Sequence, residues 1–287
     1  MAARKRLIVD GVIIDPQVDF MDLLGSALPV AGAVADMQRL STMIDRIGPK
    51  VRDFHVTLDS HHPIDVAHPG MWTNNKGESP APFTLIRSDD IRSEIWFPRN
   101  RHAKLSQLGG QTLEQYMIGY TQALEAAGKY LLMIWPEHCL IGSGGHAVQA
   151  DLFSALSRWE KANFANVDFV TKGVNPFTEH YGGLMAEVPL ASDPSTGLNT
   201  GLLTVLQEAD IVFIAGEALS HCVMTTVNQI ADNIGEEHVR KFHILTDCSS
   251  PVPQPPGGPD FPAIAKDWLK TMKKRGMTLT TSTEFLA

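Results

Sequence analysis

Short, largely apolar segments recur along the chain and alternate with longer amphipathic segments. Short apolar runs rich in β-branched residues are typical of strands buried on both faces of a parallel sheet. Apolar positions at helical spacing predict helices between them. Strands are expected at 7–14, 51–58, 130–134, 167–170, 211–215 and 242–245, and helices at 33–47, 112–127, 147–161, 198–208, 219–234 and 261–274.

This alternation predicts an α/β protein with a three-layer, doubly wound fold: a mostly parallel six-stranded sheet with helices on both faces. Two segments break the rhythm. Residues 72–110 are polar with scattered Pro and Gly, too long for a bare connection, and predict an elaborated loop, a lid or an oligomer contact. Residues 249–259 are rich in Pro and Gly and predict an extended surface loop. With no repeat and no linker, residues 1–287 are interpreted as a single domain.

Composition narrows the classes of partner. The 287 residues carry a formal net charge of -8 with no dominant basic patch, which argues against a nucleic-acid partner. No apolar run is long enough to cross a membrane, and the basic N-terminus lacks the features of a signal peptide. The 3 cysteines, Cys139, Cys222 and Cys248, are too few for a disulfide framework. A cytoplasmic protein is therefore expected.

Ligands of parallel sheets bind beyond the carboxyl ends of the strands, so the residues there matter most. Asp15 and Asp19 follow the first expected strand and serve either as helix caps or as a general acid or base. Lys172 follows the fourth, either as a solvated charge or as a cation that lowers a thiol pKa. Cys222 stands at the start of a helix, where N–H groups favour a thiolate and bind an oxyanion. We favour Cys222 as nucleophile, with Lys172 and Asp15 rather than the adjacent His221 as its partners.

A second group of polar residues has the donor types of a divalent-metal site. Asp59 and His61 end the second expected strand, and Asp65 and His68 follow them. His138 follows the third expected strand and is a further candidate ligand. Histidines in loops are about as often solvated surface residues as metal ligands, so both interpretations stay open. Beside them, Cys139 is either a ligand or a buried thiol, and Trp135 is either a core residue or the wall of a flat-ring pocket.

Three of these segments together resemble a known family. Residues 15–20, with Asp15, Gln17, Asp19 and Phe20, are similar to the first motif of the nicotinamidase and isochorismatase-like cysteine hydrolases. Lys172-Gly173 resembles the second motif. Gly216 to Cys222 resembles the nucleophile motif. The motifs occur in the expected order over nearly the whole chain, and the resemblance implies the isochorismatase-like fold.

The resemblance also implies a mechanism. Cys222 would attack a carboxamide carbon, Lys172 would hold the thiolate, and Asp15 would pass the thiol proton to the departing ammonia. A cis peptide would join Glu217 to Ala218, and the N–H groups of Ala218 and Cys222 would form the oxyanion hole. Water would then release the acid from the thioester.

The candidate metal ligands resemble the nicotinamidase branch, because isochorismatases lack this set. The resemblance implies one divalent metal ion, most often zinc, with iron or manganese as alternatives, near the pyridine nitrogen of the substrate. Asp59, His61 and His138 would bind it. The altered spacing after His61 leaves the further ligand open between His68, our choice, and Asp65.

Phe20 and Trp135 match the aromatic residues that line the substrate ring pocket in that branch. The implied reaction is metal-dependent hydrolysis of nicotinamide to nicotinate and ammonia, as in NAD salvage. Val18, Ser220 and the long insertion depart from the family pattern and keep open a related amidase acting on another amide or an N-carbamoyl compound. A non-catalytic relative would have a broken triad, and here the triad is complete. The implied partner is a small-molecule amide, and a homo-oligomer is an open alternative.

Overall fold

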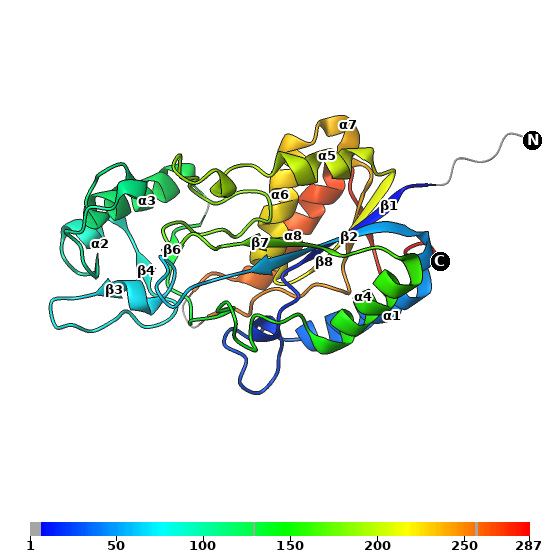
Figure 1. The fold of residues 1–287 in the computed structure, drawn as a ribbon, viewed down its shortest axis with the longest axis horizontal. Helices are drawn as coiled ribbons and strands as arrows, with labels where there is room; N and C mark the ends of the chain where they lie inside the picture. The colour runs from blue at the N-terminus through cyan, green and yellow to red at the C-terminus, as the bar shows by residue number, and fades with distance from the viewer. Residues whose placement is uncertain (1–6, 129, 256–257) are drawn as a thin grey trace, which may run out of the picture.

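The computed structural model describes residues 7–128, 130–255 and 258–287, and a parallel sheet lies at its centre (Figure 1). The sheet has six strands in the order β10-β9-β8-β1-β2-β7, and every neighbouring pair is parallel. Strand β1 lies between β2 and β8, where the strand order reverses. The strands are β1 (Val9–Ile14), β2 (Val51–Asp59), β7 (Asp168–Lys172), β8 (Ile211–Gly216), β9 (Phe242–Leu245) and β10 (Thr278–Thr280).

Helices cover both faces of this sheet, as expected from the sequence. Helices α1 (Ala33–Ile47) and α4 (Ala150–Asn163) pack together on one face. Helices α5 (Thr200–Glu208), α6 (Met224–Asn233) and α8 (Phe261–Lys274) lie on the other, with the short α7 (Glu236–Val239). The apolar stripes of these helices face the sheet and remove it from water. The predicted three-layer α/β fold is confirmed.

One predicted strand of the sheet was wrong. Within 130–134 only β6 (Leu132–Met133) is a strand, and it pairs antiparallel with β4 (Leu85–Ile86) outside the central sheet. Leu132, Met133 and Ile134 are nevertheless buried, as part of the hydrophobic core. The sixth position in the sheet belongs to β10, which the sequence pattern did not indicate. Strand β10 has only 3 residues, two of them threonine, and as an edge strand it needs no continuous apolar run.

The expected elaboration after residue 72 is larger than predicted. Residues 72–128 and 130–133 form a lobe that extends away from the sheet at the end opposite the C-terminus (Figure 1). Helix α3 was expected in the layers around the sheet, but it packs against α2 within the lobe. Its sequence specifies it locally, because Thr112 and Gln115 form a capping box and Gly128 ends it in the left-handed region. The lobe contains β3 (Trp72–Thr73), β4, α2 (Ser88–Arg92), β5 (Phe97–Pro98), α3 (Leu113–Ala127) and β6.

The Pro-rich segment 249–259 is more than a surface loop. Its described residues form no helix or strand, but Ser249 and Val252 are buried. Residues 256 and 257 lie outside the described part of the chain. Among the described residues, no helix combines the length and apolarity that a membrane span requires. The single-domain interpretation stays a prediction.

Gly216, at the carboxyl end of β8, allows two central strands to approach each other. Its φ is +118°, and a Cβ there would lie 2.0 Å from the carbonyl oxygen of Ile14. Because backbone cannot move aside cheaply, we expect Gly216→Ala to lower the free energy of unfolding by more than about 3 kcal/mol in urea titration.

Gly119 provides the matched control for this substitution. It lies exposed within α3, and an added Cβ meets no heavy atom within 4 Å. Gly119→Ala is expected to raise the free energy of unfolding by roughly 0.5–1 kcal/mol. Wild-type stability of Gly216→Ala would contradict the close approach of β1 and β8.

Candidate active site

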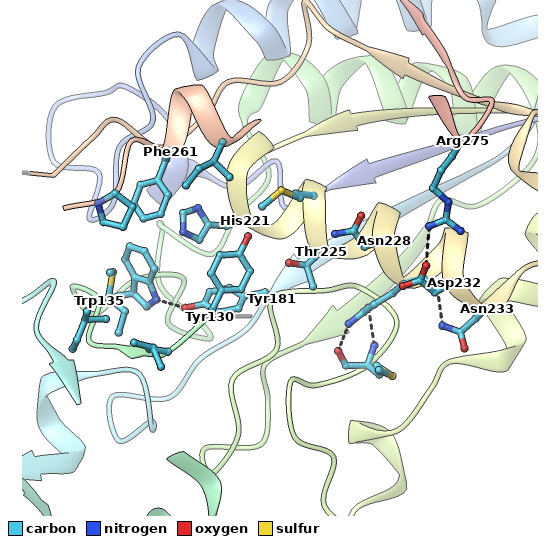
Figure 2. Close-up of a pocket in the computed structure, with 18 residues that line it drawn as sticks. Tyr130, Trp135, Tyr181, His221, Thr225, Asn228, Asp232, Asn233, Phe261 and Arg275 are labelled. Atoms are coloured by element: carbon cyan, nitrogen blue, oxygen red, sulfur yellow. Dashed lines mark hydrogen bonds and ion pairs between the residues drawn. The ribbon is translucent and has the colours of Figure 1, made fainter. Parts of the chain in front are cut away.

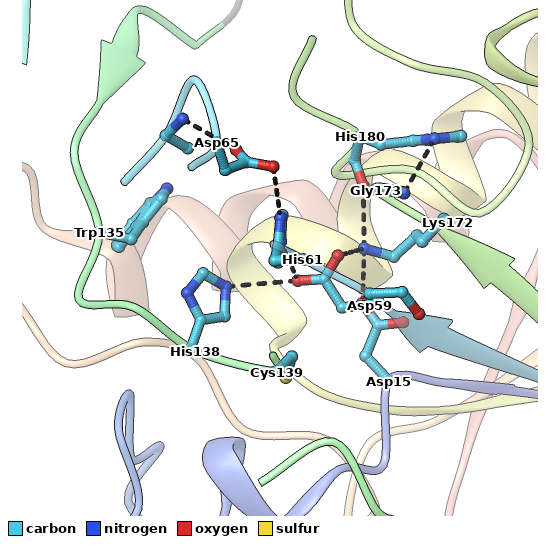
Figure 3. Close-up of polar contacts among 12 residues, drawn as sticks. Asp15, Asp59, His61, Asp65, Trp135, His138, Cys139, Lys172, Gly173 and His180 are labelled. Carbon is cyan, nitrogen blue, oxygen red and sulfur yellow. Dashed lines mark hydrogen bonds and ion pairs between the residues drawn. The ribbon is translucent and has the colours of Figure 1, made fainter. Parts of the chain in front are cut away.

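The candidate catalytic side chains lie together at the carboxyl edge of the sheet (Figure 3). Asp15 follows β1, Asp59 ends β2 and Lys172 ends β7, and these three strands are neighbours. Cys222 lies beyond β8 on the other side of β1. Four separate segments therefore supply one site at the point where the strand order reverses, which is the usual ligand position in such sheets.

Lys172 is the centre of the polar contacts in this site. Its side chain is buried, and Nζ lies 2.9 Å from Asp15 Oδ2 and 2.9 Å from Asp59 Oδ1. Nζ also donates to the carbonyl oxygen of His180 at 2.8 Å and lies 3.8 Å from Cys222 Sγ. Burial lowers the pKa of Lys172, but the two carboxylates outweigh it and hold the pKa well above its usual value. Lys172 is therefore a fixed cation beside the thiol.

Asp15 is completely buried and held by β2. Its Oδ1 accepts a hydrogen bond from Thr57 Oγ1 at 2.6 Å. The backbone N–H of Asp15 in turn donates to Thr57 Oγ1 at 3.0 Å. Burial raises the pKa of Asp15 above its usual value, although the Lys172 ammonium opposes this. A carboxyl group with a raised pKa, fixed beside a thiol, is suited to accept and return a proton.

Cys222 lies in a single π-helical turn, Leu219–Val223, that runs directly into α6. Burial raises the pKa of its thiol well above the usual value, Lys172 lowers it, and Asp15 raises it further. The sequence predicted a thiol pKa depressed by Lys172, and the structure differs because burial outweighs the single nearby cation. A raised pKa disfavours the thiolate, so nucleophilic attack by Cys222 calls for a base that takes the thiol proton.

The turn that carries Cys222 is held by its surroundings. The peptide between Glu217 and Ala218 is cis, as the family resemblance implied. Leu219 N–H donates to the carbonyl oxygen of Ser250 at 2.8 Å, which ties the turn to the Pro-rich segment. The contacts of the His221 ring are with Ser220 and Tyr130: its Nδ1 lies 2.9 Å from Ser220 Oγ, and the ring stacks on Tyr130. This contact fits the choice of Lys172 and Asp15 over His221 as partners of the thiol.

Three of the candidate metal ligands converge beside the thiol. The ligand atoms of His61, His68 and His138 all lie within 4.8 Å of one another. Asp59 Oδ2 lies 2.9 Å from His61 Nε2 and 3.3 Å from His138 Nε2. His138 reaches this place although its predicted strand is wrong, because its segment runs alongside the end of β2: His61 N–H donates to the Cys139 carbonyl at 3.1 Å.

The donor set fits a divalent cation. His68 Nδ1 donates to the carbonyl oxygen of His62 at 3.1 Å and His138 Nδ1 to that of Pro136 at 2.8 Å, so the lone pair of each neutral ring lies on Nε2. His68 Nε2 lies 3.3 Å from His138 Nδ1, and His138 Nε2 lies 3.3 Å from Asp59 Oδ2. Burial lowers the pKa of His68 to about 2, which keeps its ring neutral. Such outer hydrogen bonds are the usual support of metal-binding histidines.

Asp65 lies behind His61 rather than in the ligand group. Its Oδ2 is 3.0 Å from His61 Nδ1, and its Oδ1 accepts a hydrogen bond from the Ala67 N–H at 3.0 Å. Burial lowers the pKa of His61, but Asp59 and Asp65 outweigh it and raise the pKa well above its usual value. The same negative charge would attract a divalent cation. Of the two residues left open as further ligand, the arrangement favours His68.

A narrow cavity of about 30 Å³ lies over these groups. Asp59 and His138 line one part of it, and Ala218 and Cys222 another. Phe20 and Trp135, expected as walls of a ring pocket, both line it too, together with Leu28, Val30, Glu179, Tyr181, His221 and Val252. Cys222, His138 of the histidine cluster and the aromatic side chains therefore line one cavity.

Sequence reasoning missed the segment after Lys172. Glu179 and Tyr181 line the cavity, and Tyr181 Oη accepts a hydrogen bond from Trp135 Nε1 at 2.9 Å. Burial raises the pKa of Glu179 to about 7. His180 supplies the carbonyl oxygen that binds Lys172. These residues lie in a loop that matches none of the recognised motifs. The only signal in the sequence that could have indicated a role in the site is that polar and aromatic residues occur side by side there.

No family model and no curated protein matches the chain. Solved structures do match over nearly the whole length. A nicotinamidase and pyrazinamidase from Acinetobacter baumanii is 19% identical, with a TM-score of 0.57, over 98% of this chain and 100% of that one. The yeast nicotinamidase bound to the inhibitor nicotinaldehyde is 16% identical, with a TM-score of 0.61, over 96% and 100%. A pyrazinamidase of Pyrococcus horikoshii in complex with zinc is 18% identical, with a TM-score of 0.53, over 95% and 98%.

At these identities the likeness establishes the fold, and it agrees with the motifs that suggested the family. Each of the three structures is covered almost completely although few residues are identical. The chain has the isochorismatase-like α/β fold of the nicotinamidases and pyrazinamidases.

Proposed function

We propose that the protein is a metal-dependent amidase that hydrolyses nicotinamide to nicotinate and ammonia through a thioester on Cys222. The observation that carries the proposal is the buried contact of Lys172 with Asp15, Asp59 and the Cys222 thiol, beside a cavity that Cys222, Asp59 and His138 line. The matched nicotinamidases and the zinc-containing pyrazinamidase support the same assignment.

The geometry supports one sequence of proton transfers. Asp15 takes the thiol proton as Cys222 Sγ bonds to the amide carbon, and the Lys172 ammonium stabilises the developing thiolate. The N–H groups of Ala218 and Cys222 hold the oxyanion. When the C–N bond breaks, Asp15 returns its proton to the leaving ammonia. Water then attacks the thioester, Asp15 takes the water proton and the thiol recovers it.

The remaining groups of the cavity would position the substrate. His61, His68 and His138, with Asp59, would hold one divalent cation, most readily zinc, with iron or manganese as alternatives. Such an ion supplies a Lewis acid for the ring nitrogen of the substrate. Phe20 and Trp135 would enclose the flat ring. Part of the same proposal is a cytoplasmic place in NAD salvage, with a homo-oligomer as an open alternative.

A second candidate is an amidase for another amide or an N-carbamoyl compound. Glu179 favours it, because burial raises the pKa of this carboxyl group in the cavity wall to about 7, so that near neutral pH a substantial fraction is protonated and can donate a hydrogen bond. Such a donor would select substrates with an additional acceptor beside the scissile amide. Nicotinamide stays the first choice, because a cation held by the histidine cluster would bind the ring nitrogen that nicotinamide provides.

Ammonia release from nicotinamide tests the proposal. Purified protein loaded with zinc is expected to release one ammonia per nicotinate, and a chelator is expected to remove at least nine-tenths of the activity, since the cation would orient the ring. Added zinc should restore it. Folded, metal-loaded protein that releases no ammonia would refute the nicotinamide assignment and move the search to other amides and N-carbamoyl compounds.

A further inference from the structure

A second and much larger cavity adjoins the catalytic one (Figure 2). Its volume is about 560 Å³, within the range of roughly 300–1,000 Å³ typical of small-molecule sites. The lobe contributes Leu131 and Met133, α6 contributes Met224 and Asn228, and α8 contributes Phe261 and Ile264. The cavity therefore lies where three separate parts of the fold meet, on the side of the aromatic wall away from Cys222.

Three side chains form that wall and face both cavities: Trp135, Tyr181 and His221. Trp135 Nε1 donates to Tyr181 Oη at 2.9 Å, and the rings of Trp135 and His221 are perpendicular with centroids 5.3 Å apart. Phe261 packs on His221 from the larger cavity, with ring centroids 4.5 Å apart. The wall is a packed aromatic layer, so a molecule in the larger cavity contacts the opposite side of the layer that lines the catalytic cavity.

The lining indicates which ligand chemistry the larger cavity accepts. It is predominantly apolar, and of its described lining residues only Asp232 and Arg275 carry full charges. These two neutralise each other across 2.8 Å, and Arg275 also pairs with Glu236 at 2.8 Å. Burial lowers the pKa of His221 to about 3, so its ring is neutral as well. No unpaired charge of the described lining is left to bind an ion, while Thr225 and Asn228 provide polar groups on the α6 side.

We infer that the larger cavity is a second small-molecule site, which takes an uncharged, largely aromatic ligand and holds it against Trp135, Tyr181 and His221. The ligand is distinct from the amide that Cys222 attacks and is bound without entering the catalytic cavity. The inference rests on the shape and charge of this cavity and does not require the proposed amidase reaction.

Equilibrium binding of 2-naphthol, an uncharged two-ring probe, tests the inference. We expect saturable binding of one molecule per chain, at least tenfold tighter than binding of the anion 2-naphthoate. Ile264→Asp places a charge in the cavity lining and is expected to weaken 2-naphthol binding at least tenfold. Ile264 is 43% exposed on α8, so the variant should fold, and it should hydrolyse its amide substrate at the wild-type rate.

Ile95→Asp is the matched control, because Ile95 is 52% exposed in the lobe and does not line the cavity. It should bind 2-naphthol as the wild type does. The inference is overturned if 2-naphthol does not bind saturably, or if Ile264→Asp and Ile95→Asp bind it equally. Tighter binding of 2-naphthoate would overturn the assigned chemistry, and displacement of the probe by nicotinamide would move it to the catalytic cavity.

Discussion

Cys222→Ala is expected to lower amide hydrolysis by at least about a thousandfold while the protein stays folded. The thiol is the nucleophile of the proposed reaction, and loss of a nucleophile in comparable covalent hydrolases costs up to about a millionfold in kcat. Its place in the structure allows the change, because alanine only removes a sulfur atom that faces the cavity. Lys172 keeps its contacts with Asp15, Asp59 and the His180 carbonyl oxygen in the variant.

The measurement is the rate of ammonia release at saturating nicotinamide, with circular dichroism and urea unfolding to establish that the variant is folded. Cys248→Ala is the matched control, since Cys248 is also a buried free cysteine but lies outside the catalytic cavity. It should keep activity within about twofold of wild type and lose only packing energy, about 1 kcal/mol. Retained turnover in Cys222→Ala would remove the nucleophile assignment altogether.

His138→Ala is expected to abolish stoichiometric metal binding. The wild-type protein should bind about one divalent ion per chain, and the variant should bind it at least a hundredfold more weakly, because one of three converging imidazoles is lost. Even outer-shell changes at such sites cost about 10- to 100-fold in affinity. The dissociation constant is measured by competition with a chromogenic chelator, and the metal content by atomic emission.

His102→Ala is the control for this substitution. His102 is an exposed histidine of the lobe and lies outside the histidine cluster, so its removal should leave the metal content unchanged. A wild-type protein that is free of metal and fully active would refute the nicotinamidase branch. Unchanged metal content in His138→Ala would place the ion elsewhere in the molecule.

The sequence predicted those strands that are buried inside the sheet. Strands β1 and β8 are mostly apolar because they lie in the middle of the sheet, and that environment is visible in the sequence as a short hydrophobic run. Strand β10 could not be found this way, because at the edge of the sheet it needs few buried side chains. Strand β6 has the apolar character of a buried strand, but a hydrophobic run does not specify which partner buries it.

The candidate site likewise contains residues that the sequence could predict and residues that it could not. Asp15, Lys172 and Cys222 were identifiable because each lies at or shortly beyond the carboxyl end of a predictable strand and belongs to a spaced motif. Glu179 and Tyr181 belong to no such motif and reach the cavity only through tertiary packing. The raised pKa of the Cys222 thiol could not be predicted either, because it depends on how completely the fold buries the thiol.

In the sequence, the lobe lies between two members of the histidine cluster. His68 precedes it and His138 follows it, 70 positions later in the sequence, yet their rings are 3.3 Å apart at the nearest nitrogens. A cation held by both would therefore join the two ends of the lobe as a cross-link does. It would close a long loop and reduce the number of conformations open to the unfolded chain. Metal binding would then be coupled to folding of the lobe: the bound cation would stabilise the folded lobe, and the folded lobe would increase the affinity for the cation.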